Sequence, residues 1–304
     1  MNGIETAPSN FVMQSVLTEL APARRAVSII RARHLGMCFG VRDAIDLALK
    51  ESQRRPLTVL GELVHNETVV NDLRARGIAI EDQAAAVRTP VAMITAHGAS
   101  EKALERARAS GLEVLQATCP LVHYAHRAVQ RLVREGFHPV IVGQRGHVEV
   151  RGLTEDLAEC DVVLTEEDVK QMRERPRFGV AAQTTQPADR VLRLMEMIRG
   201  RFPRSEVLHV DTVCQPTKQR QSAALDLAGQ SDVVIVVGGA RSNNTRELAA
   251  TCQRLCKRVR HVQGAGDLRA EWFEDAQTIG ITAGTSTPDD IIDEVENWLR
   301  TSLE

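Results

Sequence analysis

Three cysteines of this chain occupy equivalent places, each in a short loop directly before a predicted helix. They are Cys38 in GMCFG, Cys119 in ATCP and Cys214 in DTVCQP. Each helix is followed by an apolar run that ends in glycine, and a polar residue stands four positions after that glycine. These polar residues are His65, His147 and Ser242, which lie 27, 28 and 28 residues after their cysteines. Agreement within one residue across three units indicates an internal repeat.

Three thiolates brought to one centre can hold a metal. The spacing lacks Cys-x-x-Cys pairs and so disfavours a zinc finger, although zinc with three thiolates and an open position is an alternative. A [4Fe–4S] cluster normally takes four cysteines, so three would leave one iron open to a molecule that is not protein. For Cys160, Cys252 and Cys256 we expect core packing. A two-thiolate metal clip at Cys252 and Cys256 is the alternative there.

Polar side chains of the three units are suited to an anion. Imidazoles, hydroxyls and amides beside helix N-termini, with hardly any Lys or Arg, favour a diphosphate held by many hydrogen bonds. Taken singly, each histidine would be interpreted as a structural residue, and Ser242 as the N-cap of a helix. Glu149 differs, because a carboxylate beside a bound anion could stay protonated and act as a general acid. The set is His65, Asn66, His97, His147, Glu149, Gln183, Thr184, Thr185, Thr217, Ser242, Asn243, Asn244 and Ser286.

The elements that position these residues follow from the pattern of apolar residues. From residue 27 onward, strand-like apolar runs alternate with amphipathic stretches, which predicts a parallel α/β architecture. The predicted strands are 27–32, 57–60, 91–95, 139–142, 161–164, 178–182, 207–210, 232–237 and 278–282. The predicted helices are 41–53, 68–76, 100–110, 121–135, 188–200, 217–229, 244–256 and 288–301.

The repeat predicts three α/β units with small parallel sheets, arranged as a trefoil around a central metal-cluster site. Each unit closes with an apolar run and a small polar cluster, namely TAHG at 95–98, QTT at 183–185 and AGTS at 283–286. Ligands of open parallel sheets bind at the carboxyl ends of the strands. We predict an N-terminal extension over 1–26 and units over 27–118, 119–211 and 212–304, with 27–38 able to pack with the third.

Composition excludes several classes of protein. The chain has 38 basic and 40 acidic residues without a basic stripe, so no nucleic-acid partner is expected. No apolar run approaches the ~18 residues of a membrane helix, so we expect no membrane association. The N-terminal stretch lacks a secretory layout, and Glu5 and Glu19 argue against an organelle transit peptide. A cytoplasmic protein with reduced thiols is the expectation.

These motifs, in this order, resemble the 4-hydroxy-3-methylbut-2-enyl diphosphate reductase (IspH/LytB) family. The resemblance covers about residues 27–290. Besides the three cysteine motifs, it rests on VHN at 64–66, AHG at 96–98, GHVEV at 146–150, QTT at 183–185, SNN at 242–244 and TAGTSTPD at 282–289.

The resemblance implies an iron–sulfur oxidoreductase of the methylerythritol phosphate pathway. Cys38, Cys119 and Cys214 would hold one [4Fe–4S] cluster per chain, whose open iron binds the substrate hydroxyl. Reduced ferredoxin or flavodoxin would supply electrons to convert (E)-4-hydroxy-3-methylbut-2-enyl diphosphate into isopentenyl and dimethylallyl diphosphate. Thr184 would orient the hydroxyl and Glu149 would relay the proton. The residues implied to bind substrate are His65, His97, His147, Ser242, Asn243, Asn244 and Ser286.

Some positions depart from the family pattern. Val148 stands where Pro is usual, Gln215 and Pro216 replace a small or aromatic residue followed by Ala, and Asn243 replaces a small residue. None of them removes a predicted ligand or the proton donor. The alternatives are a divergent iron–sulfur relative acting on another small anionic substrate, and a non-catalytic iron–sulfur sensor. A sensor would need neither an anion site nor a proton donor.

Overall fold

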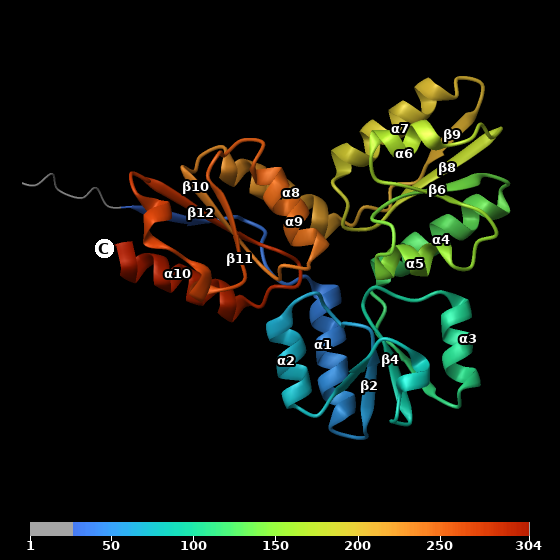
Figure 1. Ribbon diagram of the computed structural model, residues 1–304, viewed down its shortest axis with the longest axis horizontal. Coiled ribbons are helices and arrows are strands. Elements are labelled where there is room, and N and C mark those ends of the chain that lie inside the picture. The colour runs from blue at the N-terminus through green and yellow to red at the C-terminus, as the bar shows by residue number, and fades with distance from the viewer. Residues whose placement is uncertain (1–26, 304) are drawn as a thin grey trace, which may run out of the picture.

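The structure is a computed structural model that describes residues 27–303, and the expected extension over 1–26 lies outside the described residues. Three lobes surround a common centre (Figure 1), and each is built on one four-stranded parallel sheet. The predicted α/β trefoil is confirmed. The lobes are numbered first to third along the chain, and the N-terminal strand of the described chain belongs to the sheet of the third lobe.

The first lobe has the strand order β3-β2-β4-β5. Its central strands are almost wholly buried, as expected for a sheet covered by helices. The strands are β2 (Leu57–Leu60), β3 (Ala79–Glu81), β4 (Val91–Ile94) and β5 (Glu113–Gln116). The helices are α1 (Phe39–Ser52), α2 (Glu67–Ala75) and α3 (Glu101–Ala109), with a 3₁₀ turn η1 (Ala84–Ala86).

The second lobe repeats this order as β7-β6-β8-β9. Phe178 and Phe202 pack in its core with ring centroids 5.0 Å apart. The strands are β6 (His138–Val142), β7 (Asp161–Val163), β8 (Arg177–Ala182) and β9 (Glu206–His209). The helices are α4 (Pro120–Arg134), α5 (Val148–Thr154), α6 (Glu166–Gln171) and α7 (Ala188–Arg201).

The third lobe contains both ends of the described chain, in the order β1-β12-β10-β11. Successive residues of its central strand face opposite sides: Ile235 packs with α10, and Val236 packs with α8 and α9. The strands are β1 (Ser28–Arg31), β10 (Val233–Val237), β11 (Val259–Val262) and β12 (Thr278–Ala283). The helices are α8 (Gln215–Ala228), α9 (Asn243–Cys252), α10 (Asp289–Leu303), η2 (Ala265–Asp267) and η3 (Ala270–Phe273).

The strand orders make the three lobes equivalent in a cyclic sense. In each sheet one edge strand leads directly to a cysteine: β5 leads to Cys119, β9 to Cys214 and β1 to Cys38. The helix after each cysteine packs on the sheet of the next lobe: α1 on the first, α4 on the second and α8 on the third. Each cysteine therefore stands at a junction between two lobes. The unit boundaries at 118 and 211 stay a prediction.

The predicted strands and helices are confirmed to within a few residues. The sequence analysis missed the three strands β3, β5 and β11 and the two helices α5 and α6. All three strands lie at sheet edges, where only part of each strand is buried. They consequently lack the continuous apolar runs of the central strands.

Specific contacts connect the lobes to one another. The N-terminus of α3 receives acidic side chains from the second lobe, with the Glu101 amide donating to Asp156 at 2.7 Å. Arg190 of α7 forms an ion pair with Glu247 of α9 at 2.6 Å. Arg241 pairs with Glu62 and links the third lobe to the first. These contacts surround the centre at which the cysteine loops meet.

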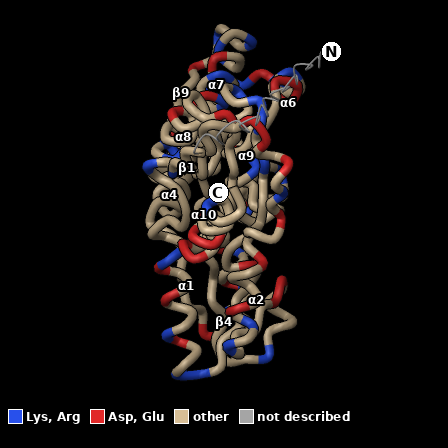
Figure 2. Tube along the Cα trace, turned by 90° about the vertical axis from the view of Figure 1, so that its left-hand side faces the viewer, with Lys and Arg blue, Asp and Glu red and all other residues tan. Residues whose placement is uncertain are grey.

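Charge is distributed over the chain without a dominant sign. In the view of Figure 2, Lys and Arg alternate with Asp and Glu along the trace. Within residues 27–303, no helix combines the length and the apolar character needed to cross a bilayer. The absence of a nucleic-acid partner stays a prediction.

Candidate active site

The three predicted ligand cysteines each cap the N-terminus of a helix. Cys38 precedes α1, Cys119 precedes α4 and Cys214 precedes α8. We call these three residues the cap cysteines. Burial raises the pKa of Cys214 to about 11 and also raises that of Cys119, while amide groups of the first helical turn act in the opposite direction. A helix N-terminus favours negative charge, so each position suits a thiolate bound to a metal.

Equivalent backbone hydrogen bonds fix the cap cysteines to the neighbouring sheets. The Cys38 amide donates to the Thr285 carbonyl at 3.0 Å, the Cys119 amide to Ala96 at 3.1 Å and the Cys214 amide to Thr184 at 2.9 Å. Each acceptor lies two residues beyond the end of a central strand, namely β12, β4 and β8. The repeated sequence therefore produces a repeated local structure.

The cap cysteines lie close to one another. A Cβ atom on Gly40 would lie 2.5 Å from the Cys119 sulfur, so only glycine lets the Cys38 segment approach Cys119 this closely. Among the described residues, the group whose ligand atoms lie close enough together to hold a single metal ion is His65, His97 and His147, and the cap cysteines do not form such a group. This arrangement favours a larger, multi-iron centre over the zinc alternative.

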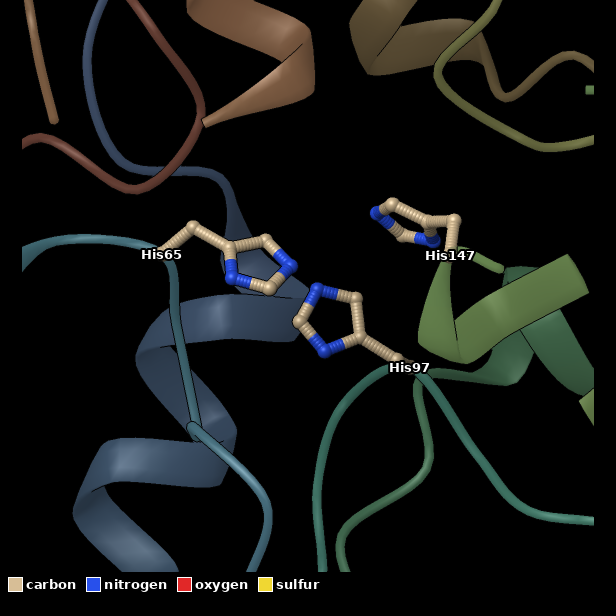
Figure 3. A group of neighbouring side chains, drawn as sticks. All are labelled: His65, His97 and His147. Atoms are coloured by element: carbon tan, nitrogen blue, oxygen red, sulfur yellow. The ribbon is translucent and has the colours of Figure 1, made fainter. Parts of the chain in front are cut away.

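Three histidines from different loops lie together (Figure 3). The ring centroids of His65, His97 and His147 are 5.1, 5.4 and 5.6 Å apart. They come from the loop after β2, the loop after β4 and the cap of α5, respectively. Glycine is required here too, because a Cβ on Gly239 would lie 2.2 Å from the His65 carbonyl oxygen. The third lobe thus closes tightly over the histidine loop of the first.

His97 and His147 are held in their neutral form. Burial lowers the pKa of His147 to about 4, aided by the neighbouring His65 and by Arg151 and Arg246. Burial, together with the other two rings, lowers the pKa of His97 well below its usual range. The His147 Nδ1 atom accepts a hydrogen bond from the Glu149 amide at 3.1 Å. In the neutral ring its proton is therefore on Nε2, which can donate to a ligand.

The third lobe contributes polar groups without protein partners. Ser242 caps α9 by accepting from the Thr245 amide at 3.3 Å. Buried side-chain atoms normally find a hydrogen-bond partner. The Nδ2 atoms of Asn243 and Asn244 and the Oγ atom of Ser286 are buried and have none within the described part of the chain. Donors left unsatisfied in this way fit a ligand rich in acceptor oxygens, such as a diphosphate.

Glu149 is fully enclosed next to these groups, with 1% of its surface exposed. The Thr184 amide donates to Oε1 at 2.6 Å and the Thr184 hydroxyl donates to Oε2 at 3.1 Å. Burial raises the pKa of Glu149 to about 7, although both Thr184 bonds act to lower it. A carboxyl that titrates near neutrality can hold a proton and release it during a reaction.

A small cavity of ≈ 40 Å³ joins the histidines, Glu149 and the donors of the third lobe. A larger cavity of ≈ 610 Å³ lies near Val27 and Leu303, at the amino ends of β1 and β12, and contains none of the predicted site residues. The small cavity is lined by Val41, Val64, His65, His97, His147, Glu149, Thr185, Ser242, Asn243, Asn244, Thr285 and Ser286.

The structure places other members of the predicted polar set outside this cavity. Thr184 acts through Glu149, and Thr217 bonds the Cys214 sulfur at 3.1 Å. Asn66 caps α2, and Gln183 accepts from the Gln144 amide at 3.1 Å. Val41, Val64 and Thr285 also line the cavity but were not among the predicted site residues. Val64 and Thr285 stand within the VHN and AGTS motifs, and Thr285 follows β12 at the same distance as Ala96 follows β4.

The remaining cysteines lie apart from the cap cysteines. The Cys252 sulfur lies 3.8 Å from the Ala224 carbonyl and the Cys256 sulfur lies 3.5 Å from that of Asp232. Burial raises the pKa of Cys252 to about 12. Both sulfur atoms lie against backbone carbonyls within an apolar core, and this arrangement favours packing over the metal clip. Cys160 is half-buried at the start of β7.

Comparison with known proteins agrees with this arrangement. A family model described as LytB protein matches residues 29–300. The chain belongs to the LytB family. The 4-hydroxy-3-methylbut-2-enyl diphosphate reductase of Aquifex aeolicus is 38% identical over 287 residues, covering 91% of this chain and 98% of that protein. The protein of the same name from Anaeromyxobacter sp. (strain K) is 37% identical over 273 residues, covering 88% and 97%.

Solved structures of LytB-family relatives have the same fold. The E-1-hydroxy-2-methyl-but-2-enyl-4-diphosphate reductase of Plasmodium falciparum superposes with a TM-score of 0.84 at 26% identity, covering 90% of this chain and 88% of that one. A structure of (E)-4-hydroxy-3-methyl-but-2-enyl diphosphate reductase is 35% identical and covers 91% of this chain and 100% of that one, with a TM-score of 0.65. Of these two structures, the one with the higher sequence identity has the lower TM-score.

Proposed function

We propose that this chain reduces (E)-4-hydroxy-3-methylbut-2-enyl diphosphate to isopentenyl and dimethylallyl diphosphate, the last step of the methylerythritol phosphate pathway. One observation carries the proposal: three equivalent helix-capping cysteines lie near Glu149, a buried and protonatable carboxyl that lines one cavity together with unpaired hydrogen-bond donors. The names of the relatives support the same substrate.

The cap cysteines would hold one [4Fe–4S] cluster per chain. They do not form a single-ion group among the described residues, and each stands at the positive end of a helix. When bound, such a cluster supplies electrons and an iron that lacks a protein ligand. Reduced ferredoxin or flavodoxin in the cytoplasm would be the electron donor.

The residues around the cavity have separate proposed roles in substrate binding and in proton transfer. We assign the diphosphate to His65, His97 and His147 on one side. Ser242, Asn243, Asn244 and Ser286, which approach from the third lobe, would complete the diphosphate site. Neutral donors in a water-poor cavity can bind an anion closely, and the bound anion would in turn favour the protonated form of a neighbouring imidazole. Thr184 would orient the substrate hydroxyl, since its own hydroxyl is already fixed by Glu149.

Glu149 would protonate the hydroxyl that leaves. The overall reaction consumes two electrons and two protons, breaks the allylic C–O bond and releases water. A hydroxide is a poor leaving group, so a proton must reach the oxygen as the bond breaks. Glu149 can deliver it because the pKa of about 7 keeps much of the carboxyl protonated at neutral pH.

The three histidines also satisfy the distance criterion for a metal ion, with ligand atoms within 4.8 Å of one another. The hydrogen bond to the Glu149 amide argues against that use. It requires a lone pair on the Nδ1 atom of His147, so the neutral ring carries its proton on Nε2 and cannot ligate there. A donor role toward an anion is compatible with the same bond.

The test is anaerobic purification with measurement of iron and sulfide, followed by turnover of the hydroxylated diphosphate with a low-potential donor. We expect close to four irons per chain and formation of both isoprenoid diphosphates. A protein with iron and sulfide but no turnover would favour the sensor alternative. Thermal unfolding then gives a second criterion, because the substrate diphosphate should raise Tm for the reductase and leave it unchanged for a sensor.

A further inference from the structure

A single arginine connects two of the cap cysteines. Arg220 lies on α8 and is 9% exposed. Its Nε and Nη2 atoms donate to the Gly36 carbonyl at 3.0 and 2.8 Å, and Nη1 donates to the Pro216 carbonyl at 3.1 Å. Gly36 stands two residues before Cys38, and Pro216 stands two residues after Cys214. The guanidinium therefore ties the Cys38 loop to the first turn after Cys214.

This buried cation has no carboxylate partner. Among the described residues, no Asp or Glu forms an ion pair with Arg220, and its donors contact only backbone carbonyls. Burying a charge without a counter-charge is strongly unfavourable. Burial lowers the pKa of Arg220, and the nearby Cys38 and Cys214 act to raise it. An arginine side chain nevertheless stays protonated. The anionic groups within its reach are these two sulfurs when they are thiolates.

We propose that Arg220 is the fixed counter-charge of the cysteine-bound centre and raises its reduction potential. The inference rests on the proposed iron–sulfur cluster. The thiolates bring more negative charge than the oxidised iron–sulfur core neutralises, and reduction adds a further negative charge. A neighbouring positive charge therefore stabilises the reduced form more than the oxidised form. Because Arg220 is buried, solvent screens this interaction less than it would screen a surface charge.

The geometry also explains why this residue is an arginine. The planar guanidinium reaches two carbonyls from separate segments while its charge remains beside the sulfurs. A lysine would keep the charge but lose the fork of donors. Arg220 is thus a positioning residue that acts through Cys38 and Cys214. Substitutions can therefore separate the effect of the positive charge from the effect of the hydrogen bonds to the two carbonyls.

The experiment measures the midpoint potential of the reconstituted cluster in wild type, Arg220→Met and Arg220→Lys by anaerobic spectroelectrochemical titration. At the wild-type midpoint, we expect the reduced-to-oxidised ratio of Arg220→Met to fall about tenfold, which is about 59 mV for one electron. Arg220→Lys should retain most of the wild-type ratio. Arg258→Met is the matched control, because Arg258 also donates to two backbone carbonyls but precedes β11 at the amino end of its sheet.

Iron and sulfide contents are measured on every sample, so that the two proposals fail in different ways. Wild type without iron and sulfide would contradict the proposed function. A loaded Arg220→Met with the wild-type potential, or equal shifts in Arg220→Met and Arg220→Lys, would overturn the counter-charge inference alone. If Arg220→Met does not hold the cluster, Arg220→Gln is titrated in its place. If Arg220→Lys holds the cluster and neither Arg220→Met nor Arg220→Gln does, the positive charge is required and the inference is supported. Loss of the cluster in all three variants contradicts it.

Discussion

Replacing Glu149 with Gln separates proton donation from binding. Gln has the same length and can still accept a hydrogen bond from Thr184, but it has no transferable proton. General acids contribute about 10²–10⁴ in rate. We expect kcat of Glu149→Gln to fall by about that factor, with iron content and diphosphate affinity close to wild type. In wild type, the acid form decreases about tenfold per pH unit above about 7, so kcat should decline there.

The same substitution has a calculable effect on stability. Burial raises the Glu149 pKa from 4.5 to about 7 in the folded state, and one unit corresponds to about 1.4 kcal/mol, giving about 3 kcal/mol in full. A raised pKa means that the folded state binds the proton more tightly than the unfolded state. The stabilisation is therefore complete below about pH 4.5 and is lost as pH rises through about 7. Between pH 5.5 and 8 the expected loss in wild type is about 2 kcal/mol.

Urea unfolding of cluster-free protein at the two pH values checks this. Glu149→Gln should gain about 2 kcal/mol relative to wild type between pH 5.5 and 8. Glu67→Gln is the matched control, because Glu67 occupies the equivalent second position after its histidine but is exposed at the start of α2. A pH-independent difference, together with kcat near wild type, would refute the reasoning. If His147→Ala then lost kcat alone, the roles of these two neighbours would be reversed.

Four further outcomes are expected. Replacing any cap cysteine with Ser should abolish iron retention and turnover, whereas Cys252→Ala should leave iron content unchanged, as measured by metal analysis. Gly40→Ala should displace the Cys119 sulfur, since the added Cβ would lie 2.5 Å from it, and the cluster absorbance should be lost with the fold retained by circular dichroism. His147→Ala should weaken diphosphate binding in calorimetry by about ten- to a hundredfold, because one hydrogen bond to a charged group is worth ≈ 1.5–3 kcal/mol. Exposure to air should remove iron and activity together, and full activity after prolonged aeration would contradict the cluster.

The lobes and their cysteines were predictable because the sequence repeats them. Central strands such as β10 are wholly buried, so a continuous apolar run marks each one. The edge strands β11 and β5 are only partly buried and mix polar with apolar residues, VRHV and EVLQ, and neither was predicted. Helix α5 has only seven residues with Gly152 inside it, so its composition gives little helical signal. It forms because His147 caps it and Val150 and Leu153 are buried.

Within the candidate site, residue types were predictable but their partners were not. Equal spacing after each cysteine indicated that His65, His147 and Ser242 stand in equivalent loops. Nothing in the spacing showed that Thr184 would hold Glu149 through two hydrogen bonds. Arg220 was also missed, because an arginine within a helix carries no local signal of burial. Its partner, the Gly36 carbonyl, is 184 residues away in the sequence.

The pairing of β1 with β12 has a consequence for biosynthesis. Ser28 is paired with Thr278, so the first described strand completes a sheet whose other strands all come after those of the other two sheets. A chain emerging from the ribosome can fold the sheet of β2–β5 and that of β6–β9 while β1 still has no neighbouring strand. The Cys38 amide obtains its acceptor only after Thr285 has been made. The Cys38 loop is therefore fixed in place later than the loops of Cys119 and Cys214, whose acceptors come from the first two sheets.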